Sequence, residues 1–269
     1  MPELPEVETV ARQLDRVLPG RILRGLQVRD PKLAHLESLA GSLGGARLGR
    51  IRRSGKRVIL PLEDEGSVRG WLAVHLRMTG RLLLVEEGAA EPAPARLCLE
   101  LDRGRLLFAD TRRFGTVDWL TRPAELAPPG LDPFDPACTP TALAELARAA
   151  RAPLKSWLLD QKRVCGLGNI YVCEILHACR LSPWRAAGSL EPAQWRLLHR
   201  EMRRILRLAI ENCGTTFSDF QDSRGLEGSF GRMLQVYGRA GAACPRCGAV
   251  VQRETQAQRG SWWCPGCQE

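Results

Sequence analysis

The sequence predicts an α+β protein with several domains: an N-terminal helix on a β-sandwich, then a helical domain that ends in a cysteine-rich ribbon. Three observations support this prediction. Short alternating apolar runs in the first half give way to long helical patterns in the second. A segment rich in proline and aspartate, residues 123–140, separates the two patterns. Two Cys-x-x-Cys pairs lie near the C-terminus.

The first helix is predicted from the spacing of apolar residues near the N-terminus. Pro5 suits a first helical turn, where its missing N–H would have no partner, and the nearby glutamates suit the positive end of the helix dipole. Pro19–Gly20 ends the helix. The residues predicted to form its buried face are Val7, Val10, Leu14, Val17 and Leu18.

Many short apolar runs separated by Gly, Pro and charged residues follow, up to about Leu120. Such a series is typical of a β-sandwich or barrel. The predicted strands are Ile22–Val28, Val58–Leu62, Val68–His75, Leu82–Val85, Leu97–Leu101, Leu106–Phe108 and Val117–Leu120.

The second half reads as helices at residues 141–150, 169–179 and 191–212. The buried face of the longest helix is predicted to be Trp195, Leu198, Met202 and Ile205. Residues 213–231, rich in Gly, Ser and Asp, are predicted to form a mobile loop. The predicted division is a catalytic sandwich domain at 1–122, a linker at 123–140, a helical domain at 141–231 and a ribbon hairpin at 232–269.

Composition favours a polyanionic partner. The 269 residues carry a formal net charge of +9, with a pI near 9.3, and the simplest partner for such a chain is nucleic acid. An arginine-rich genome is the other explanation of the charge. The N-terminus lacks the basic start and apolar stretch of a secretory signal, and no apolar run reaches 18 residues. We therefore expect a cytoplasmic protein without a membrane partner.

The ten cysteines fall into two groups. Cys244 and Cys247 are followed, after sixteen residues, by Cys264 and Cys267. This spacing predicts one tetrahedral zinc on a β-hairpin, structural because four thiolates leave no open position for water. The scattered cysteines are expected to behave as small buried hydrophobic residues.

The N-terminus offers a second chemical signal. Met1 precedes the small residue Pro2 and should be removed, which exposes a secondary amine. Such an amine can attack the anomeric carbon of a sugar and form an iminium. Only four lysines, Lys32, Lys56, Lys155 and Lys162, would compete for this role.

Several motifs, in order along the whole chain, resemble the formamidopyrimidine-DNA glycosylase family. The opening stretch Met1–Thr9 is similar to the start of these enzymes, and the paired cysteines close the match. The stretches between them that resemble the family are residues 52–56, 75–80, 110–115, 154–160, 166–171, 213–216 and 234–238, with 257–259 inside the ribbon.

The resemblance implies a role for individual residues. Pro2 would be the nucleophile, Glu3 the acid that assists departure of the base, Lys56 a participant in β-elimination and Arg259 in δ-elimination. Asn169 and its glycine-rich turn would hold backbone phosphate. The remaining residues expected to contact DNA are His75, Met78, Arg112, Phe114 and Lys155, of which Met78, Arg112 and Phe114 would fill the gap left by a flipped nucleotide.

The resemblance also implies the reaction and the fold of the helical part. The enzyme would excise oxidised purines, 8-oxoguanine and formamidopyrimidines, from double-stranded DNA through a Schiff base on Pro2. β,δ-Elimination would then leave a one-nucleotide gap. The helical part would be a helix–two-turn–helix domain with a base-capping loop, DNA would lie in a cleft between the domains, and the protein would be a nucleoid-associated bacterial monomer.

Taken by themselves, the same residues have simpler interpretations. Phe114 and Met78 could be core side chains, His75 a structural histidine, Lys56 and Arg259 solvated charges, and Asn169 only a helix N-cap. The chain also departs from the family pattern. Residues 92–95 replace a stretch that usually contains histidine, Gln256 stands where histidine is usual, and Arg57 where an aromatic residue is common.

Three other functions compete with this interpretation. The sister endonuclease VIII type removes oxidised pyrimidines, and Leu4 together with Met78, Arg112 and Phe114 favours the purine type. A zinc-ribbon DNA-binding protein without activity would not need Pro2, Glu3 and Lys56. A ribosome-associated zinc protein would prefer RNA.

Overall fold

The computed structural model describes residues 2–91, 94–215 and 228–269. The chain divides into two compact units, one of residues 1–127 and 212–231, the other of residues 128–211 and 232–269. Within the described residues, no helix combines the length and the apolar character needed to cross a membrane.

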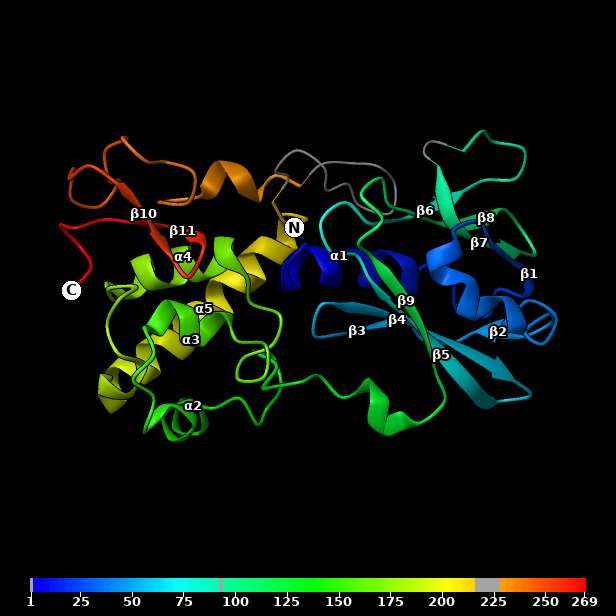
Figure 1. The fold of residues 1–269 in the computed structure, drawn as a ribbon, viewed down its shortest axis with the longest axis horizontal. Coiled ribbons are helices and arrows are strands. Elements are labelled where there is room, and N and C mark those ends of the chain that lie inside the picture. Colours follow the sequence, from blue (N-terminus) through cyan, green and yellow to red (C-terminus); the bar gives the residue numbers. More distant parts are fainter. Residues whose placement is uncertain (1, 92–93, 216–227) are drawn as a thin grey trace. The chain divides into compact units, whose positions relative to one another are not determined.

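The first unit is a β-sandwich covered by one helix (Figure 1). The helix is α1, Leu4–Asp15. One antiparallel sheet has the order β1-β7-β8-β6, and the other has the order β2-β4-β5-β9, with β3 also paired to β4. The strands are β1 Leu23–Val28, β2 Arg47–Leu48, β3 Arg52–Ser54, β4 Arg57–Asp64, β5 Ser67–His75, β6 Arg81–Val85, β7 Ala95–Leu101, β8 Arg105–Ala109 and β9 Thr116–Leu120.

One hydrophobic core joins the helix and both sheets. Side chains of α1 pack in the same cluster as Leu72 and Val74 of β5 and Leu99 of β7. Burial of apolar surface from all three layers is the main stabilising contribution to such a unit. The predicted helix and sandwich are therefore confirmed, although Val17, expected on the buried face, is 43% exposed.

The predicted strands all form, and no strand end differs from the prediction by more than two residues. The sequence pattern missed the short strands β2 and β3 and two 3₁₀ helices, η1 at Pro31–Leu39 and η2 at Pro123–Leu126. Asp30 caps η1 by accepting a hydrogen bond from Lys32 N at 3.0 Å. Because 3₁₀ segments bury few residues at irregular spacing, apolar periodicity does not reveal them.

The second unit is helical and ends in a hairpin (Figure 1). Trp157 and Trp195 meet edge to face at 5.4 Å and join α3 to α5, and the predicted buried face of α5 is buried in full. Its elements are α2 Pro140–Ala147, α3 Leu154–Leu159, α4 Asn169–Cys179, η3 Ala187–Ser189, α5 Pro192–Glu211, β10 Gln252–Gln256 and β11 Arg259–Trp263; a short 3₁₀ turn, η4 Phe230–Met233, precedes the hairpin segment.

The two observed units are divided differently from the predicted domains. The predicted linker is split, with residues 123–127 in the first unit and 128–140 in the second, and the ribbon segment 232–269 belongs to the second unit together with the helices. Residues 212–231, expected in the helical domain, belong to the first unit. Thr215 explains this last difference, because its N–H and hydroxyl both donate to Glu6 of α1, at 2.8 and 3.1 Å. Most of the predicted mobile, base-capping loop, residues 216–227, lies outside the described residues.

Candidate active site and DNA interface

The N-terminus lies at the positive end of helix α1. Pro2 is buried and directly precedes Glu3, the N-cap residue of the helix. Glu3 is only 2% exposed, and its N–H donates to Glu6 Oε2 at 2.8 Å in a capping box. An amine at this position is disfavoured in its protonated form by the helix dipole, whereas the two buried carboxylates oppose that effect.

Glu6 connects the N-terminus to the base of the segment that follows α5. One carboxylate oxygen accepts from Glu3 N, and the other accepts from Thr215 N and Thr215 Oγ1. Thr215 itself pairs with Ser229 in an isolated β-bridge. Both ends of the predicted base-capping loop are thus held close to the residues around Pro2.

Lys56 lies in the two-residue turn between β3 and β4, which Ser54 and Arg57 close. Gly55 adopts a positive φ of 57°, which a residue without a side chain tolerates best. Arg53 ties this turn to α1, because it donates to Glu8 Oε2 and to Gly55 O, each at 2.9 Å. Lys56 is 9% exposed, so it is not a freely solvated surface charge.

Arg57, which replaces a commonly aromatic residue, has a structural role. Its Nη2 lies 3.2–3.3 Å from the carbonyl oxygens of Glu125, Leu126 and Ala127. These contacts hold residues 125–127 against the β3–β4 hairpin, within the first unit.

His75 ends strand β5 and begins the loop of residues 76–80. Its Nδ1 accepts from Arg77 N at 3.1 Å. Burial, with the neighbouring charges of Arg77 and Lys56, lowers the pKa of His75 from its usual 6.5 to about 4. The imidazole is therefore neutral at pH 7, and with Nδ1 as acceptor its proton lies on Nε2, which can donate to a phosphate.

This lowered pKa has a consequence for stability. As the pH falls from 6.5 to about 4, His75 is protonated in the unfolded chain but stays neutral in the folded chain. The free energy of unfolding therefore decreases as the pH falls through this window. Acidification from pH 7 to pH 4.5 should lower the free energy of unfolding by about 2 kcal/mol less in His75→Gln than in wild type. Urea unfolding at both pH values measures this, and an equal loss in wild type and variant would contradict it.

The three residues predicted to replace a flipped nucleotide, Met78, Arg112 and Phe114, are exposed. Met78 is 40% and Phe114 50% exposed, which excludes the simpler interpretation that they are core side chains. Arg112 places its guanidinium carbon 4.8 Å from the centre of the Phe114 ring. Exposed apolar side chains at loop tips, one of them under a cation, suit contact with stacked bases.

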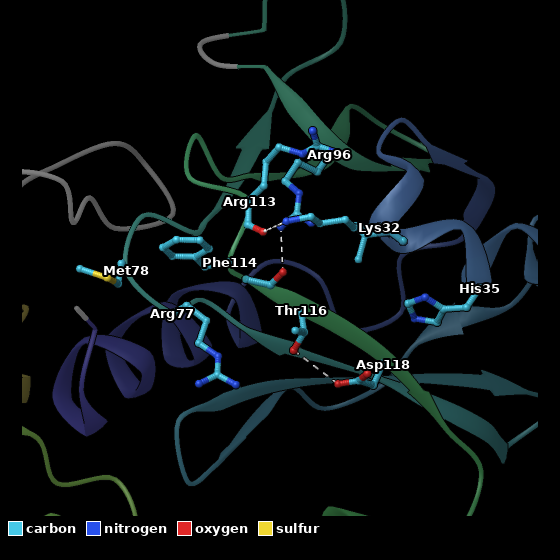
Figure 2. Close-up of a pocket in the computed structure, with 11 residues that line it drawn as sticks. Lys32, His35, Arg77, Met78, Arg96, Arg113, Phe114, Thr116 and Asp118 are labelled. Carbon is cyan, nitrogen blue, oxygen red and sulfur yellow. Dashed lines mark hydrogen bonds between the residues drawn. The ribbon is translucent and has the colours of Figure 1, made fainter.

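A cavity of about 710 Å³ lies beside Met78 and Phe114 (Figure 2). In Figure 2 these two side chains lie at one end of the cavity and His35 at the other. Lys32 and Arg113 both line the cavity, and Lys32 Nζ donates to Arg113 O at 3.3 Å.

In the second unit, Lys155 and Asn169 converge on the ribbon hairpin. Lys155 is 1% exposed, and its Nζ donates to Gly260 O and Ser261 Oγ, both at 2.7 Å. Asn169 Nδ2 donates to the same carbonyl at 3.0 Å. This burial does not fit the direct DNA contact expected for Lys155. Both hydrogen bonds of its ammonium are made to the ribbon hairpin, not to groups at the surface.

Asn169 is the first residue of α4, and Gly168 is the N-cap, so the simpler interpretation of Asn169 as the N-cap is wrong. The turn that leads into α4 is organised by Gln161. Its side chain accepts from Gly166 N at 3.0 Å and donates to the carbonyls of Leu159 and Leu167. Gly166 has a φ of 86°, a conformation that favours glycine.

Arg259 begins β11 and is exposed. The hairpin closes through Ala257 and Gln258, both with positive φ, 47° and 62°. Such a turn usually contains Asn or Gly, so these residues carry strain that neighbouring contacts must offset. The bonds of Lys155 and Asn169 to Gly260, and of Gln256 to Pro183 O at 3.1 Å, are those contacts.

Four sulfur atoms gather at the base of the hairpin. The ligand atoms of the four paired cysteines lie within 4.8 Å of one another. Cys247 Sγ is 3.4 Å from Cys264 Sγ, and Cys244 Sγ is 3.9 Å from Cys267 Sγ. Four thiolates at about 2.3 Å from a tetrahedral zinc are about 3.8 Å apart, so the cluster fits one structural zinc.

His177 supports this metal site from α4. It is 2% exposed, and its Nε2 lies 3.3 Å from Cys244 Sγ. Burial lowers the pKa of His177 to about 4, so the neutral ring can donate to a metal-bound thiolate. Among the scattered cysteines, Cys213 is partly exposed, and the other five are buried as expected.

Sequence reasoning named Glu6 only as an acidic residue of the first helical turn, and it did not single out Thr79, Arg96 or Asp110. Thr79 and Asp110 belong to motifs that the resemblance used, but a motif does not show which of its side chains are buried. Arg96 stands among apolar residues at the start of β7. A charged residue in such a run is rarely buried without an ion-pair partner, and this was the signal that could have indicated a buried ion pair.

Comparison with known proteins places these features in one family. Residues 1–117 match the formamidopyrimidine-DNA glycosylase N-terminal domain, residues 129–221 its H2TH domain, and residues 241–269 the zinc finger found in FPG and IleRS. The chain belongs to the formamidopyrimidine-DNA glycosylase family. This family membership makes it a DNA glycosylase of base excision repair, and DNA is its partner.

Full-length relatives agree with this assignment. The formamidopyrimidine-DNA glycosylase of Chloroflexus aurantiacus is 41% identical, over all of this chain and 98% of the relative. The Lactococcus lactis Fpg bound to DNA with an abasic site is similar with a TM-score of 0.90 and 33% identity, over 99% of each chain. MutM in complex with carbocyclic 8-oxo-G containing DNA matches with a TM-score of 0.88 and 33% identity, over 100% of each chain.

Proposed function

We propose that this glycosylase removes oxidised purines, 8-oxoguanine and formamidopyrimidines, and then cleaves the strand as an abasic-site lyase through a Schiff base on Pro2. The observation that carries this proposal is the N-terminus itself. A secondary amine, available once Met1 is removed, lies at the positive end of α1 beside two buried carboxylates, Glu3 and Glu6. A structural DNA-binding protein has no need of this arrangement.

The chemistry follows from the amine. Its lone pair attacks C1′ of the damaged nucleotide, and the bond from C1′ to the base breaks as Glu3 assists the departing base with a proton. The bond between C1′ and the ring oxygen then breaks, the oxygen stays on C4′ as a hydroxyl, and an iminium forms between Pro2 and the opened sugar. The iminium acidifies the neighbouring C2′–H, so that the 3′ phosphate leaves by β-elimination, assisted by Lys56. A second elimination, assisted by Arg259, releases the 5′ phosphate and leaves a one-nucleotide gap.

DNA recognition is proposed for the exposed residues on the first unit. A base inside a duplex must be flipped out before C1′ can be attacked, which costs a few kcal/mol. Met78 and Phe114 would replace the lost stacking, and Arg112 would hydrogen-bond the orphaned partner base. His75, neutral with its proton on Nε2, would donate to a phosphate.

In the second unit, the glycine-rich turn and the N-terminus of α4 would bind backbone phosphate, because the positive end of a helix dipole favours an anion. For Lys155 we propose a positioning role in place of a direct contact, since it holds the carbonyl next to Arg259.

We further propose that the protein acts as a monomer on double-stranded DNA in the cytoplasm, associated with the nucleoid.

The choice of the base opposite the lesion tests this function. Arginine offers only donors, so Arg112 should favour an orphaned cytosine, with acceptors at O2 and N3, over adenine. Such contacts discriminate by about 1–3 kcal/mol. We therefore expect Arg112→Ala to reduce the preference for 8-oxoguanine opposite C over A by about tenfold, measured as the ratio of kcat/KM values.

Arg103→Ala, in the turn between β7 and β8, is the matched control and should keep the preference. A lesion panel completes the test, and 8-oxoguanine and formamidopyrimidine should be excised faster than oxidised pyrimidines. The reverse ranking would assign the chain to the endonuclease VIII type. Absence of excision by the zinc-loaded protein would contradict the proposed function.

A further inference from the structure

We propose that a buried network of Thr79, Asp110, Arg96 and Asp30 holds two loops, residues 76–80 and 110–115, in a fixed relative position. Held in this way, the two loops would recognise the orphaned base as one rigid unit. Opposite-base selectivity would then depend on side chains that touch no DNA. This inference rests on the proposed function, because it gives these loops the task assigned to Met78, Arg112 and Phe114. The loops follow different strands, β5 and β8, so their relative position is not fixed by the chain.

Thr79 connects the two loops directly. Its hydroxyl donates to Asp110 Oδ1 and accepts from Arg112 N at 3.2 Å. Thr79 is 8% exposed and Asp110 3%. The hydroxyl thus joins the loop that carries Met78 to the backbone of the arginine that would read the partner base.

Asp110 fixes the far end of its own loop. Its Oδ2 accepts from Gly115 N at 2.6 Å and from Arg96 Nη1 at 3.2 Å. Gly115 cannot carry a side chain here, because a Cβ would lie 2.6 Å from Phe108 Cζ. The carboxylate therefore closes the loop on both sides of Arg112 and Phe114.

Arg96 neutralises and anchors this carboxylate, and Asp30 in turn anchors Arg96. Arg96 is 5% exposed, donates to Asp30 and to Gly115 O at 2.8 Å, and lies over the Phe108 ring. Asp30 also accepts from Arg113 Nε at 2.9 Å. These hydrogen bonds, that of Arg113 foremost, hold the pKa of Asp30 far below its usual range.

The burial of this network contrasts with the exposure of the residues it holds. Met78 and Phe114 expose about half of their surface, so their own packing cannot fix them. Charged groups buried with all their partners satisfied lock geometry, because breaking one bond leaves another group unpaired. The network therefore supplies the rigidity that discrimination between two partner bases requires.

The test uses an isosteric pair of variants. Thr79→Val keeps the volume and removes both hydrogen bonds of the hydroxyl, whereas Thr79→Ser keeps both. Thr116→Val, on the rim of the same cavity but outside the network, is the control. The first measurement is amide hydrogen exchange of residues 109–116 in the free enzyme. The second is the ratio of 8-oxoguanine excision opposite C and opposite A, with KM and kcat determined separately.

We expect Thr79→Val to accelerate exchange in this segment by about tenfold, the effect of losing one hydrogen bond to a charged group. The C-over-A ratio should fall about three- to tenfold, while Thr79→Ser and Thr116→Val stay within twofold of wild type. Unchanged exchange would overturn the proposal. Excision opposite C and A that falls in parallel would also overturn it, because that is the result of general destabilisation. A wild-type enzyme that excises nothing would contradict the proposed function instead, and the exchange measurement would still decide whether the network holds the loops.

Discussion

Blocking the amine of Pro2 is expected to abolish both base excision and strand cleavage. A protein that retains Met1, or carries one extra residue before Pro2, has an amide in place of the secondary amine and cannot form an iminium. Removal of a covalent nucleophile typically costs several orders of magnitude, and we expect a loss of at least about a thousandfold in kcat. Single-turnover cleavage of DNA containing 8-oxoguanine opposite C measures the effect.

Trapping identifies the attacking atom. Borohydride reduces an iminium to a stable amine, so it should link wild-type enzyme to lesion DNA, and peptide mapping should place the adduct on residue 2. Pro2→Gly should lose most of the lyase activity while DNA binding persists. An adduct on Lys56 or Lys155, or full activity with Met1 retained, would overturn this mechanism.

Glu3→Gln separates the two steps of the same reaction. It should slow base release by about 10²–10⁴-fold, the usual contribution of a general acid. It should affect cleavage of a preformed abasic site less, since no base remains to be expelled. Equal effects on both substrates would remove Glu3 from the role of the acid.

Loss of one zinc ligand is the second change with a large expected effect. Cys247→Ser should release the metal, because the cluster needs four thiolates and metal binding supplies much of the folding free energy of so small a unit, about 10–16 kcal/mol in isolated zinc fingers. The hairpin would then loosen, and Arg259 with its strained turn would lose its position. We expect DNA affinity to fall at least about tenfold.

The measurements are zinc content by elemental analysis and binding to DNA that carries a stable abasic-site analogue. Cys213→Ser, partly exposed and outside the cluster, is the control and should retain both metal and binding. Wild-type protein purified without zinc, or a Cys247→Ser protein that keeps it, would contradict the structural role of the metal.

Local patterns predicted the elements of this fold well. The spacing of Val7, Val10 and Leu14 located α1, and the pattern at residues 169–179 gave the bounds of α4. Both predictions depend only on residues within three or four positions of each other, where helical geometry decides which side chains share a face. The paired cysteines likewise determine their site locally, because each pair lies in one tight turn.

The direction in which a long polar side chain points depends on its tertiary surroundings. Lys155 was expected at DNA, but its ammonium is buried on the hairpin, 105 residues away in sequence. A lysine ammonium normally stays in water, and it is buried here only because Gly260 O and Ser261 Oγ accept its hydrogen bonds, which the sequence does not reveal. For Phe114 and Met78, residue type alone also allowed a core position, and only the resemblance predicted the exposure that the structure shows.

The helix and sandwich, the four zinc ligands and the position of Pro2 and Glu3 at a helix start could be predicted from sequence, because each of these depends on short-range spacing or on residue identity. Which polar groups meet depends on the tertiary structure. Glu6 reaches Thr215 across 209 residues, and Thr79 reaches Asp110 across 31. These pairs form because a carboxylate taken out of water must find donors, and the donors within reach depend on how strands and loops from distant parts of the chain pack.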